Sequence, residues 1–318
     1  MLTMRLLFIV ARVGVVLGAL VGPARADDLP EIKSKSAVIL DAETGAELFA
    51  KDADEVRAIA STTKIFVAMA VRKKGLDLDG WTEITKADAR EAKGGARTRL
   101  DVGEKFKNED LLRAMLMASD NRAPTALGRG VGLDPDELVK AMNGIARDLH
   151  LKRTKFTDPS GLHGNVSTAR EMAIALRIAL EDDVLRRIMG DADREIRSKG
   201  GHRIHYGTTN QVLVAKKYDV IGGKTGFTKP AGYCFITGAR FDHREVVMAF
   251  YGGDEKSTRF ADFNRAAAWL DRGAPGAKAR LAHHEPHARP NAKLEVRGRI
   301  AEPSPPEPAD DPAPAVNE

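Results

Sequence analysis

The first stretch with catalytic potential is Ser61-Thr62-Thr63-Lys64, which stands at the head of an apolar run over residues 65–71. If this run is a helix, Ser61 and Lys64 lie three residues apart on one face, so the amine can reach the hydroxyl. A serine hydroxyl is a weak nucleophile at neutral pH, and an adjacent amine with a lowered pKa can take its proton. The pair is therefore a candidate nucleophile and general base. An isolated pair of this spacing also fits a helix N-cap beside a solvated lysine, so the assignment depends on further motifs.

Two further motifs could complete such a site. Ser119-Asp120-Asn121 follows an apolar run that is typical of a buried helix. Its hydroxyl and amide can converge on one ligand, the first moving a proton and the second holding a carbonyl. Lys224-Thr225-Gly226 precedes a β-rich segment. On a strand, Thr225 faces away from the other two, so all three line one pocket only where the strand is twisted or bulged, a distortion that glycine permits.

In this order, Ser-x-x-Lys, Ser-x-Asn and Lys-Thr-Gly resemble the low-molecular-mass penicillin-binding proteins of the D-alanyl-D-alanine carboxypeptidase/endopeptidase family. The similarity extends to Asp158-Pro159-Ser160-Gly161-Leu162, to Thr209-Asn210 and to Ala231-Gly232-Tyr233. It covers roughly residues 35 to 270. Because three separate motifs occur in the family's order, the resemblance is a specific one.

The resemblance implies a serine-type carboxypeptidase that acts on peptidoglycan stem peptides, needs no cofactor or metal, and is inhibited covalently by β-lactam antibiotics. Ser61 would attack the carbonyl of a terminal D-alanyl-D-alanine with Lys64 as base, and Ser119 would relay a proton to the leaving amine. The oxyanion would be held by backbone N–H groups of Ser61 and Phe227, and the terminal carboxylate by Thr225 and Thr228. The full set expected to bind substrate is Asn121, Lys224, Thr225, Gly226, Phe227 and Thr228.

Three other functions fit parts of the same pattern. An endopeptidase of this family would cut D-alanyl cross-links instead of trimming a terminal residue, and the sequence does not separate the two. A class A β-lactamase would need Glu-x-x-Leu-Asn between the second and third motifs, and Glu171, Glu181 and Glu195 all lack the following Leu-Asn. A non-catalytic penicillin-recognition or wall-binding module would tolerate loss of Ser61 or Lys64, and both are present.

The elements that would position these residues follow from apolar periodicity and stop signals. Strands are expected on both sides of a turn at residues 42–45, and a helix should begin at Ser61 and end near Lys74-Gly75. The middle of the chain is expected to be mainly helical and the later part to return to strands. The expected helices are 108–118, 121–129, 135–149 with Asp134 as cap, 168–180 with a capping box from Ser167 or Thr168 to Glu171, and 257–270; the expected strands are 37–41, 46–50, 202–205, 218–221, 233–240 and 245–251.

Strands at both ends with helices between them predict an α/β (α+β) fold. The resemblance implies the same architecture, that of the β-lactamases and DD-peptidases: an antiparallel sheet flanked by helices, with an inserted helical subdomain and the active site between them. The single cysteine, Cys234, lies among apolar residues of an expected strand and is predicted to be a buried structural thiol. The catalytic domain should span residues 27–271.

Residues 1–26 have the pattern of an export signal, with Arg5 in a basic start, an apolar stretch, and Ala24-Arg25-Ala26 as a small-x-small cleavage site. A retained anchor is the alternative, but Arg12 interrupts the apolar stretch and leaves few residues for a span. No transmembrane segment is expected after cleavage, so the mature protein should be exported, to a periplasmic or other extracytoplasmic location.

Charge and the C-terminal composition complete the prediction. The net charge of +5 falls to +2 without the three arginines of residues 1–26, so nucleic acid is not expected as a partner. Residues 272–318 are rich in Pro, Ala and charge and are predicted to be disordered. Three histidines there, His283, His284 and His287, lack the acidic or cysteine partners that a metal site in a folded context would have.

Overall fold

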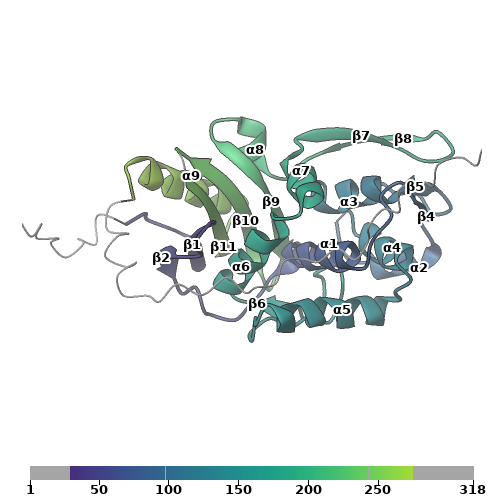
Figure 1. The fold of residues 1–318 in the computed structure, drawn as a ribbon, viewed down its shortest axis with the longest axis horizontal. Helices are drawn as coiled ribbons and strands as arrows, with labels where there is room; N and C mark the ends of the chain where they lie inside the picture. Colours follow the sequence, from purple (N-terminus) through teal and green to yellow (C-terminus); the bar gives the residue numbers. More distant parts are fainter. Residues whose placement is uncertain (1–28, 97, 243, 275–318) are drawn as a thin grey trace, which may run out of the picture.

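The centre of the fold is a five-stranded antiparallel sheet with the strand order β2-β1-β11-β10-β9 (Figure 1). The computed structural model describes residues 29–96, 98–242 and 244–274. The N-terminal hairpin joins the sheet through β1, which pairs with the last strand, so that Ser36 lies opposite Tyr251 from a distant part of the chain. The strands are β1 (Ser36–Asp41), β2 (Glu47–Lys51), β9 (Asp219–Thr228), β10 (Gly232–Phe241) and β11 (Arg244–Gly253).

Both faces of this sheet are covered, because successive side chains of a strand point to opposite sides. In β11, Val247 and Ala249 join the larger apolar cluster, whereas Val246, Met248 and Phe250 join the smaller one. The larger cluster lies under α1 (Lys64–Lys73) and α6 (Ala169–Ala179), and the smaller one under α9 (Thr258–Asp271). The continuous apolar runs of the central strands follow from this double burial.

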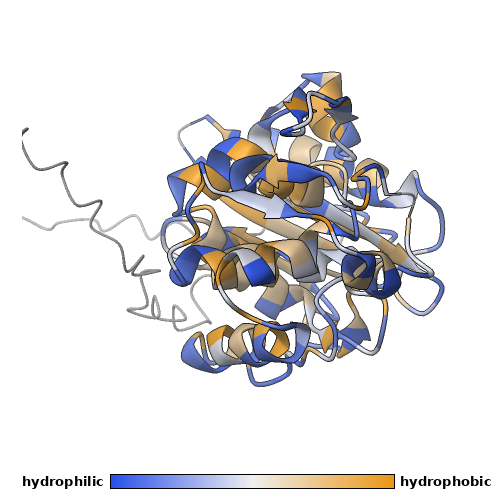
Figure 2. Cartoon of the chain, turned by 90° about the vertical axis from the view of Figure 1, so that its right-hand side faces the viewer, coloured by the Kyte–Doolittle hydropathy of each residue, from blue (hydrophilic) through white to orange (hydrophobic). Residues whose placement is uncertain are grey.

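A helical region is inserted between β2 and β9, and part of it packs around α1. Residues 64–71 of α1 are all buried, so the helix is enclosed on every side over these residues. Figure 2 shows apolar residues on the interior strands and helix faces, and hydrophilic residues toward the outside. The inserted helices are α2 (Lys86–Glu91), α3 (Asn108–Leu116), α4 (Ala123–Gly130), α5 (Pro135–Asp148), α7 (Asp183–Gly190) and α8 (Gln211–Ala215). Small two-stranded sheets accompany them, formed by β3 (Arg57–Ala58) with β6 (Val166–Ser167), β4 (Trp81–Glu83) with β5 (Lys105–Lys107), and β7 (Asp193–Arg197) with β8 (Arg203–Gly207).

The predicted fold class is confirmed, and most of the expected helices and strands are found to within a few residues of their bounds. The strand expected at 218–221 is longer, because β9 continues to Thr228 and includes the Lys-Thr-Gly motif. Helix α7 and strand β7 were not predicted. Two further details differ. The helix expected to begin at Ser61 begins at Lys64, after a 3₁₀ turn over Ala60–Thr63. The capping box expected before α6 is half formed, because Thr168 accepts from the Glu171 N–H while the Glu171 carboxylate accepts from Arg153 and Thr154 instead. These two hydrogen bonds, to residues 18 and 17 positions earlier in the chain, replace the bond from the Thr168 N–H that would complete the capping box.

Within the described residues, no helix has the length and apolar character that a bilayer span needs. The expected export signal at 1–26 and the tail lie outside the described part, apart from residues 272–274.

Candidate active site

Ser61 lies in the 3₁₀ turn that leads into α1, with its hydroxyl 2.9 Å from the Lys64 Nζ. A 3₁₀ helix has three residues per turn, so residues i and i+3 eclipse one another. This turn therefore aligns serine and lysine more directly than an α-helical turn would. The turn begins at Ala60, which has a φ of +48°, a conformation that costs non-glycine residues about 1 to 2 kcal/mol.

Lys64 is buried, and three acceptors surround its side-chain nitrogen. Nζ donates to Ser61 Oγ at 2.9 Å, to Asn121 Oδ1 at 2.6 Å and to the Ser160 carbonyl at 2.9 Å. Burial lowers the pKa of Lys64 to about 7, although the carboxylates of Asp158 and Asp120 act in the opposite direction. Near neutral pH, a large fraction of this lysine is therefore a neutral amine with a free lone pair, and the Ser61 hydroxyl can donate to it.

The second motif occupies the loop after α3, and Asp120 fixes its shape. The Asp120 carboxylate accepts from the backbone N–H groups of Arg99 and Arg122 and from the Tyr206 hydroxyl, at 2.8, 3.0 and 2.9 Å. This arrangement directs the buried Asn121 amide at Lys64. Ser119, which has a φ of +63°, makes no hydrogen bond to Ser61, Lys64 or Lys224 in the part of the chain that the structure describes.

The third motif lies on β9, which is an edge strand of the sheet. Lys224 is buried and donates to the Thr225 carbonyl at 2.7 Å. Its pKa is well below the usual range, because of burial first, then the positive charges of Lys64 and Arg259. No register shift occurs from Lys224 to Thr228; the one shift between β9 and β10 lies at Gly238/Ala239. The bulge that would have aligned all three side chains of the motif is therefore not present there.

The remaining residues of β9 have separate environments. Thr225 Oγ1 donates to Thr209 Oγ1 at 2.7 Å. Gly226 packs against the 3₁₀ turn, where an added Cβ would lie 3.0 Å from the Ser61 nitrogen. Phe227 is 52% exposed and stacks on Tyr233, with ring centroids 4.3 Å apart. Thr228 Oγ1 accepts from the Ala231 N–H at 3.2 Å, in the turn before β10.

The segment after α5 supplies a contact to Lys64 for which the sequence predicted no role. The Asp158 carboxylate accepts from the N–H groups of Ser160, Gly161, Leu162 and His163, at 2.8 to 3.2 Å, and from the Ser160 hydroxyl at 2.6 Å. These bonds hold the Ser160 carbonyl beside Lys64. The sequence did contain a local signal, because aspartate followed by serine and glycine favours a turn that the aspartate side chain closes.

Arg259, on α9, is a second residue that sequence reasoning missed. Its guanidinium donates to the carbonyls of Gly226 at 2.8 Å and Cys234 at 3.0 Å, and lies over the Tyr233 ring. It therefore adds positive charge behind β9, and no short-range pattern in the sequence distinguishes it. Cys234 is buried as predicted, and burial raises the pKa of its thiol to about 12, which makes it a poor nucleophile.

The fold and the site together define the class of serine enzymes to which the DD-transpeptidases belong. The crystal structure of the Streptomyces K15 DD-transpeptidase matches with a TM-score of 0.71 and 25% identity, over 76% of this chain and 98% of that one. Among curated proteins, the D-alanyl-D-alanine endopeptidase of Pseudomonas aeruginosa is 31% identical over 245 residues, which are 76% of this chain and 79% of the relative. The endopeptidase of Escherichia coli is 29% identical over 277 residues, 86% of this chain and 88% of the relative.

The peptidase S11 family model, described as D-alanyl-D-alanine carboxypeptidase, matches residues 23–254. The chain therefore belongs to the D-alanyl-D-alanine carboxypeptidase family of serine peptidases, as its three motifs predicted.

Proposed function

We propose that the protein is a penicillin-sensitive D-alanyl-D-alanine carboxypeptidase that removes the terminal D-alanine of peptidoglycan stem peptides through an acyl-enzyme on Ser61. The observation that carries this proposal is the buried Lys64, 2.9 Å from the Ser61 hydroxyl and with a pKa near neutrality. Neither residue alone would support it, because serine needs a base and an ordinary lysine is fully protonated at neutral pH.

In the acylation step, Ser61 Oγ attacks the carbonyl carbon of the penultimate D-alanine while its proton passes to neutral Lys64. Backbone N–H groups of Ser61 and Phe227 hold the resulting oxyanion, and each such donor contributes on the order of 3 kcal/mol. Ser119 relays the proton to the leaving nitrogen, which departs as D-alanine. Water then attacks the ester with Lys64 again as base, and this step regenerates Ser61.

The substrate would lie along the free edge of β9, between that strand and the loop of Ser119 and Asn121. The Asn121 side-chain NH₂ would donate to the peptide carbonyl, while its Oδ1 continues to accept from Lys64. Gly226 permits the close approach of β9 to the catalytic turn. The terminal carboxylate would bind at Thr225 and Thr228, where an anion would favour the charged form of the buried Lys224.

A second candidate is cleavage of D-alanyl cross-links, which uses the same acylation and a different leaving amine. The relatives from Pseudomonas aeruginosa and Escherichia coli, which are 31% and 29% identical to this chain, are both named endopeptidases, and this observation favours it. Both reactions place the protein where peptidoglycan is, outside the cytoplasmic membrane. A β-lactamase is disfavoured because the segment beside Lys64 presents the carbonyl of Ser160 and lacks a Glu-x-x-Leu-Asn sequence.

Two measurements test this proposal. Purified protein should form a stable adduct with a fluorescent penicillin, and it should release D-alanine from a monomeric pentapeptide muropeptide. Digestion of purified cross-linked dimers separates the two candidates, since only an endopeptidase converts them to monomers. Rapid turnover of penicillin without a lasting adduct would contradict the proposal, and so would failure to cleave either muropeptide.

A further inference from the structure

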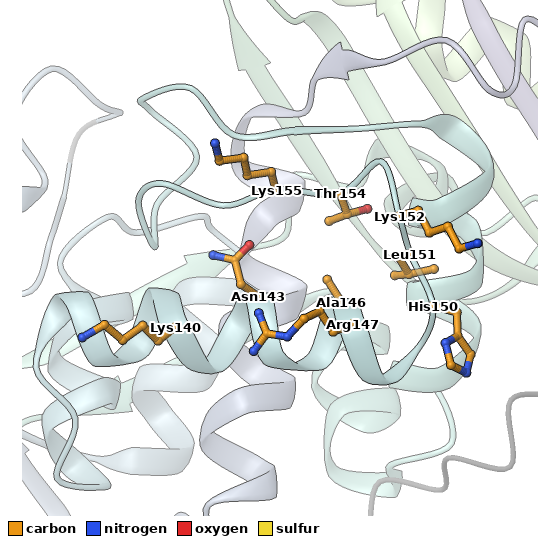
Figure 3. A pocket seen from close by; sticks show the side chains of 9 residues that line it. All are labelled: Lys140, Asn143, Ala146, Arg147, His150, Leu151, Lys152, Thr154 and Lys155. Carbon is orange, nitrogen blue, oxygen red and sulfur yellow. The ribbon is translucent and has the colours of Figure 1, made fainter.

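A strongly basic pocket lies on the face formed by α5 and the segment that follows it (Figure 3). It has a volume of about 530 Å³, and five of the nine residues that line it are cationic or histidine: Lys140, Arg147, His150, Lys152 and Lys155. No carboxylate lines it. The mechanism on Ser61 uses none of these residues.

The four lysine and arginine side chains are exposed, and among the described residues none of them forms an ion pair. The carboxylates nearby have other partners. Asp148 pairs with Lys73 at 2.8 Å, and Glu171 accepts from Arg153 and Thr154. The positive charge of the pocket is therefore not compensated by these acids, and a bound anion would provide the missing opposite charge.

Hydrogen bonds connect the two segments that line the pocket. Asn143 donates to the Phe156 carbonyl at 2.9 Å and accepts from the Phe156 N–H at 3.0 Å, which ties the segment to α5. Thr154 bonds to Ser167 and Glu171, at 2.7 and 2.6 Å. A preformed pocket loses less entropy on binding than one that must order itself.

The basic side chains are spread around the pocket rather than gathered at one point (Figure 3). A neighbouring pocket between α5 and α1 extends the positive face with Lys73 and Lys74, and its one carboxylate is the paired Asp148. Cations that are spread apart match a polymer with repeated negative groups better than they match a single compact anion. The proposed substrate is such a polymer, because each uncross-linked stem peptide ends in a carboxylate.

We propose that this basic pocket is an exosite that holds carboxylates of the peptidoglycan polymer away from the reacting peptide. The proposal rests on the function proposed above. The segment that forms the pocket continues directly to Asp158 and Ser160, which contact the catalytic site, so a polymer held there lies against the same loop that supports Lys64. Binding at the exosite should affect the polymer and leave a short soluble peptide unaffected.

The test is co-sedimentation of the full-length protein with purified insoluble peptidoglycan at low ionic strength. The pocket variant carries Arg147→Glu and Lys152→Glu, and the matched control carries Lys86→Glu and Arg272→Glu, which change the net charge equally at exposed positions outside the pocket. We expect the pocket variant to bind peptidoglycan at least tenfold more weakly than wild type and the control to bind within about twofold. The difference should shrink with added salt, because screening weakens exposed charges.

Acylation by penicillin and release of D-alanine from a soluble pentapeptide should be the same in wild type and both variants. Failure of those two assays in wild type would contradict the proposed function, whereas the sedimentation result bears on the exosite alone. Equal binding of peptidoglycan by wild type and the pocket variant would overturn the exosite. Equal loss of binding in the pocket variant and the control would also overturn it, because net charge alone would then explain the binding. If the pocket variant loses binding to phosphatidylglycerol vesicles and keeps binding to peptidoglycan, the occupant is a lipid surface and the assignment to peptidoglycan is wrong.

Discussion

Replacement of Lys64 by arginine should abolish acylation, because the catalytic role requires a side chain that can lose its proton. Burial brings the pKa of Lys64 from its ordinary value of 10.5 to about 7. Arginine keeps the positive charge and can donate to the same acceptors, but its pKa stays above about 12, so no neutral base is available. The substitution therefore separates the charge of the residue from its basicity.

The expected size of the effect follows from the populations. At pH 7, a lysine with a pKa of about 7 is half neutral. With an unperturbed pKa of about 10.5, only about 3 in 10⁴ molecules would be neutral, so the shift multiplies the active form by about 10³. General-base catalysis contributes about 10² to 10⁴ in rate. We therefore expect Lys64→Arg to slow acylation by at least about 10²-fold at pH 7.

Stopped-flow acylation by a fluorescent penicillin between pH 5 and pH 9 measures this effect. In wild type the rate should rise about tenfold per pH unit below pH 7 and then level off, because the neutral amine is the active form. Lys224→Arg serves as the control, since it leaves Lys64 in place; an inflection should remain, and the fixed arginine charge beside Lys64 should move it only to lower pH. Lys64→Met tests whether poor packing of the arginine causes the loss of acylation, because methionine is close to lysine in size and cannot accept a proton.

The hypothesis fails if Lys64→Arg acylates within about tenfold of wild type, a barrier difference of only ~1.4 kcal/mol. It also fails if the inflection near pH 7 persists in either Lys64 variant.

Four other substitutions or measurements test separate features of the site. Ser61→Ala should form no covalent penicillin adduct, and mass spectrometry that located an adduct on another residue would show that the nucleophile is misassigned. Gly161→Ala should lower the free energy of unfolding by about 2 kcal/mol or more, because the φ of Gly161 is +86° and the new Cβ would lie 2.0 Å from a backbone oxygen. In the control Gly201→Ala, the φ is +91° and the space is open, so denaturant unfolding should show a loss of only about 1 kcal/mol in the free energy of unfolding. Asp158→Asn removes a charge that raises the pKa of Lys64, so the midpoint of the acylation profile should move to lower pH, and a shift to higher pH would contradict this electrostatic role. Finally, the unfolded state binds one more proton at Lys64 between about pH 7 and pH 10.5, so the unfolding free energy of wild type relative to Lys64→Met should increase with pH over that window, and an unchanged difference would argue against a lowered pKa.

The sequence predicted those parts of the structure that depend on local periodicity. The apolar runs of β10 and β11 indicated strands, and the fourteen residues of α5 follow a clear helical pattern after the Asp134 cap. Helix α7 was missed although its signals were present, since Asp182 caps it and the buried Leu185, Ile188 and Met189 have helical spacing. Strand β7 has one buried residue in five, so its sequence lacks the alternation that indicates a strand.

The catalytic pair was predictable because three residues of separation already bring Ser61 and Lys64 together. The hydrogen-bond partners that surround this pair were less predictable. The Ser160 carbonyl that accepts from Lys64 is 96 residues away in the sequence, and Arg259 reaches the Gly226 carbonyl over 33 residues. Hydrogen bonds of this kind depend on how the sheet and the helices pack, and one sequence contains no pattern from which to derive them.

The glycine of Lys-Thr-Gly shows how the sequence can point to a residue for an incomplete reason. Gly226 was expected to allow a bulge that would align the whole motif, but β9 pairs regularly with β10 there. Its importance lies in close approach, since a Cβ would meet both Ala60 and the Ser61 nitrogen at 3.0 Å. Gly161, in the segment after α5, contacts the same turn, and a Cβ added to it would lie 2.0 Å from the Ala60 carbonyl oxygen. Two glycines from distant parts of the chain therefore leave space for Ala60 in its positive-φ conformation. Packing of the turn against them offsets the backbone strain of this conformation, which holds Ser61 beside Lys64.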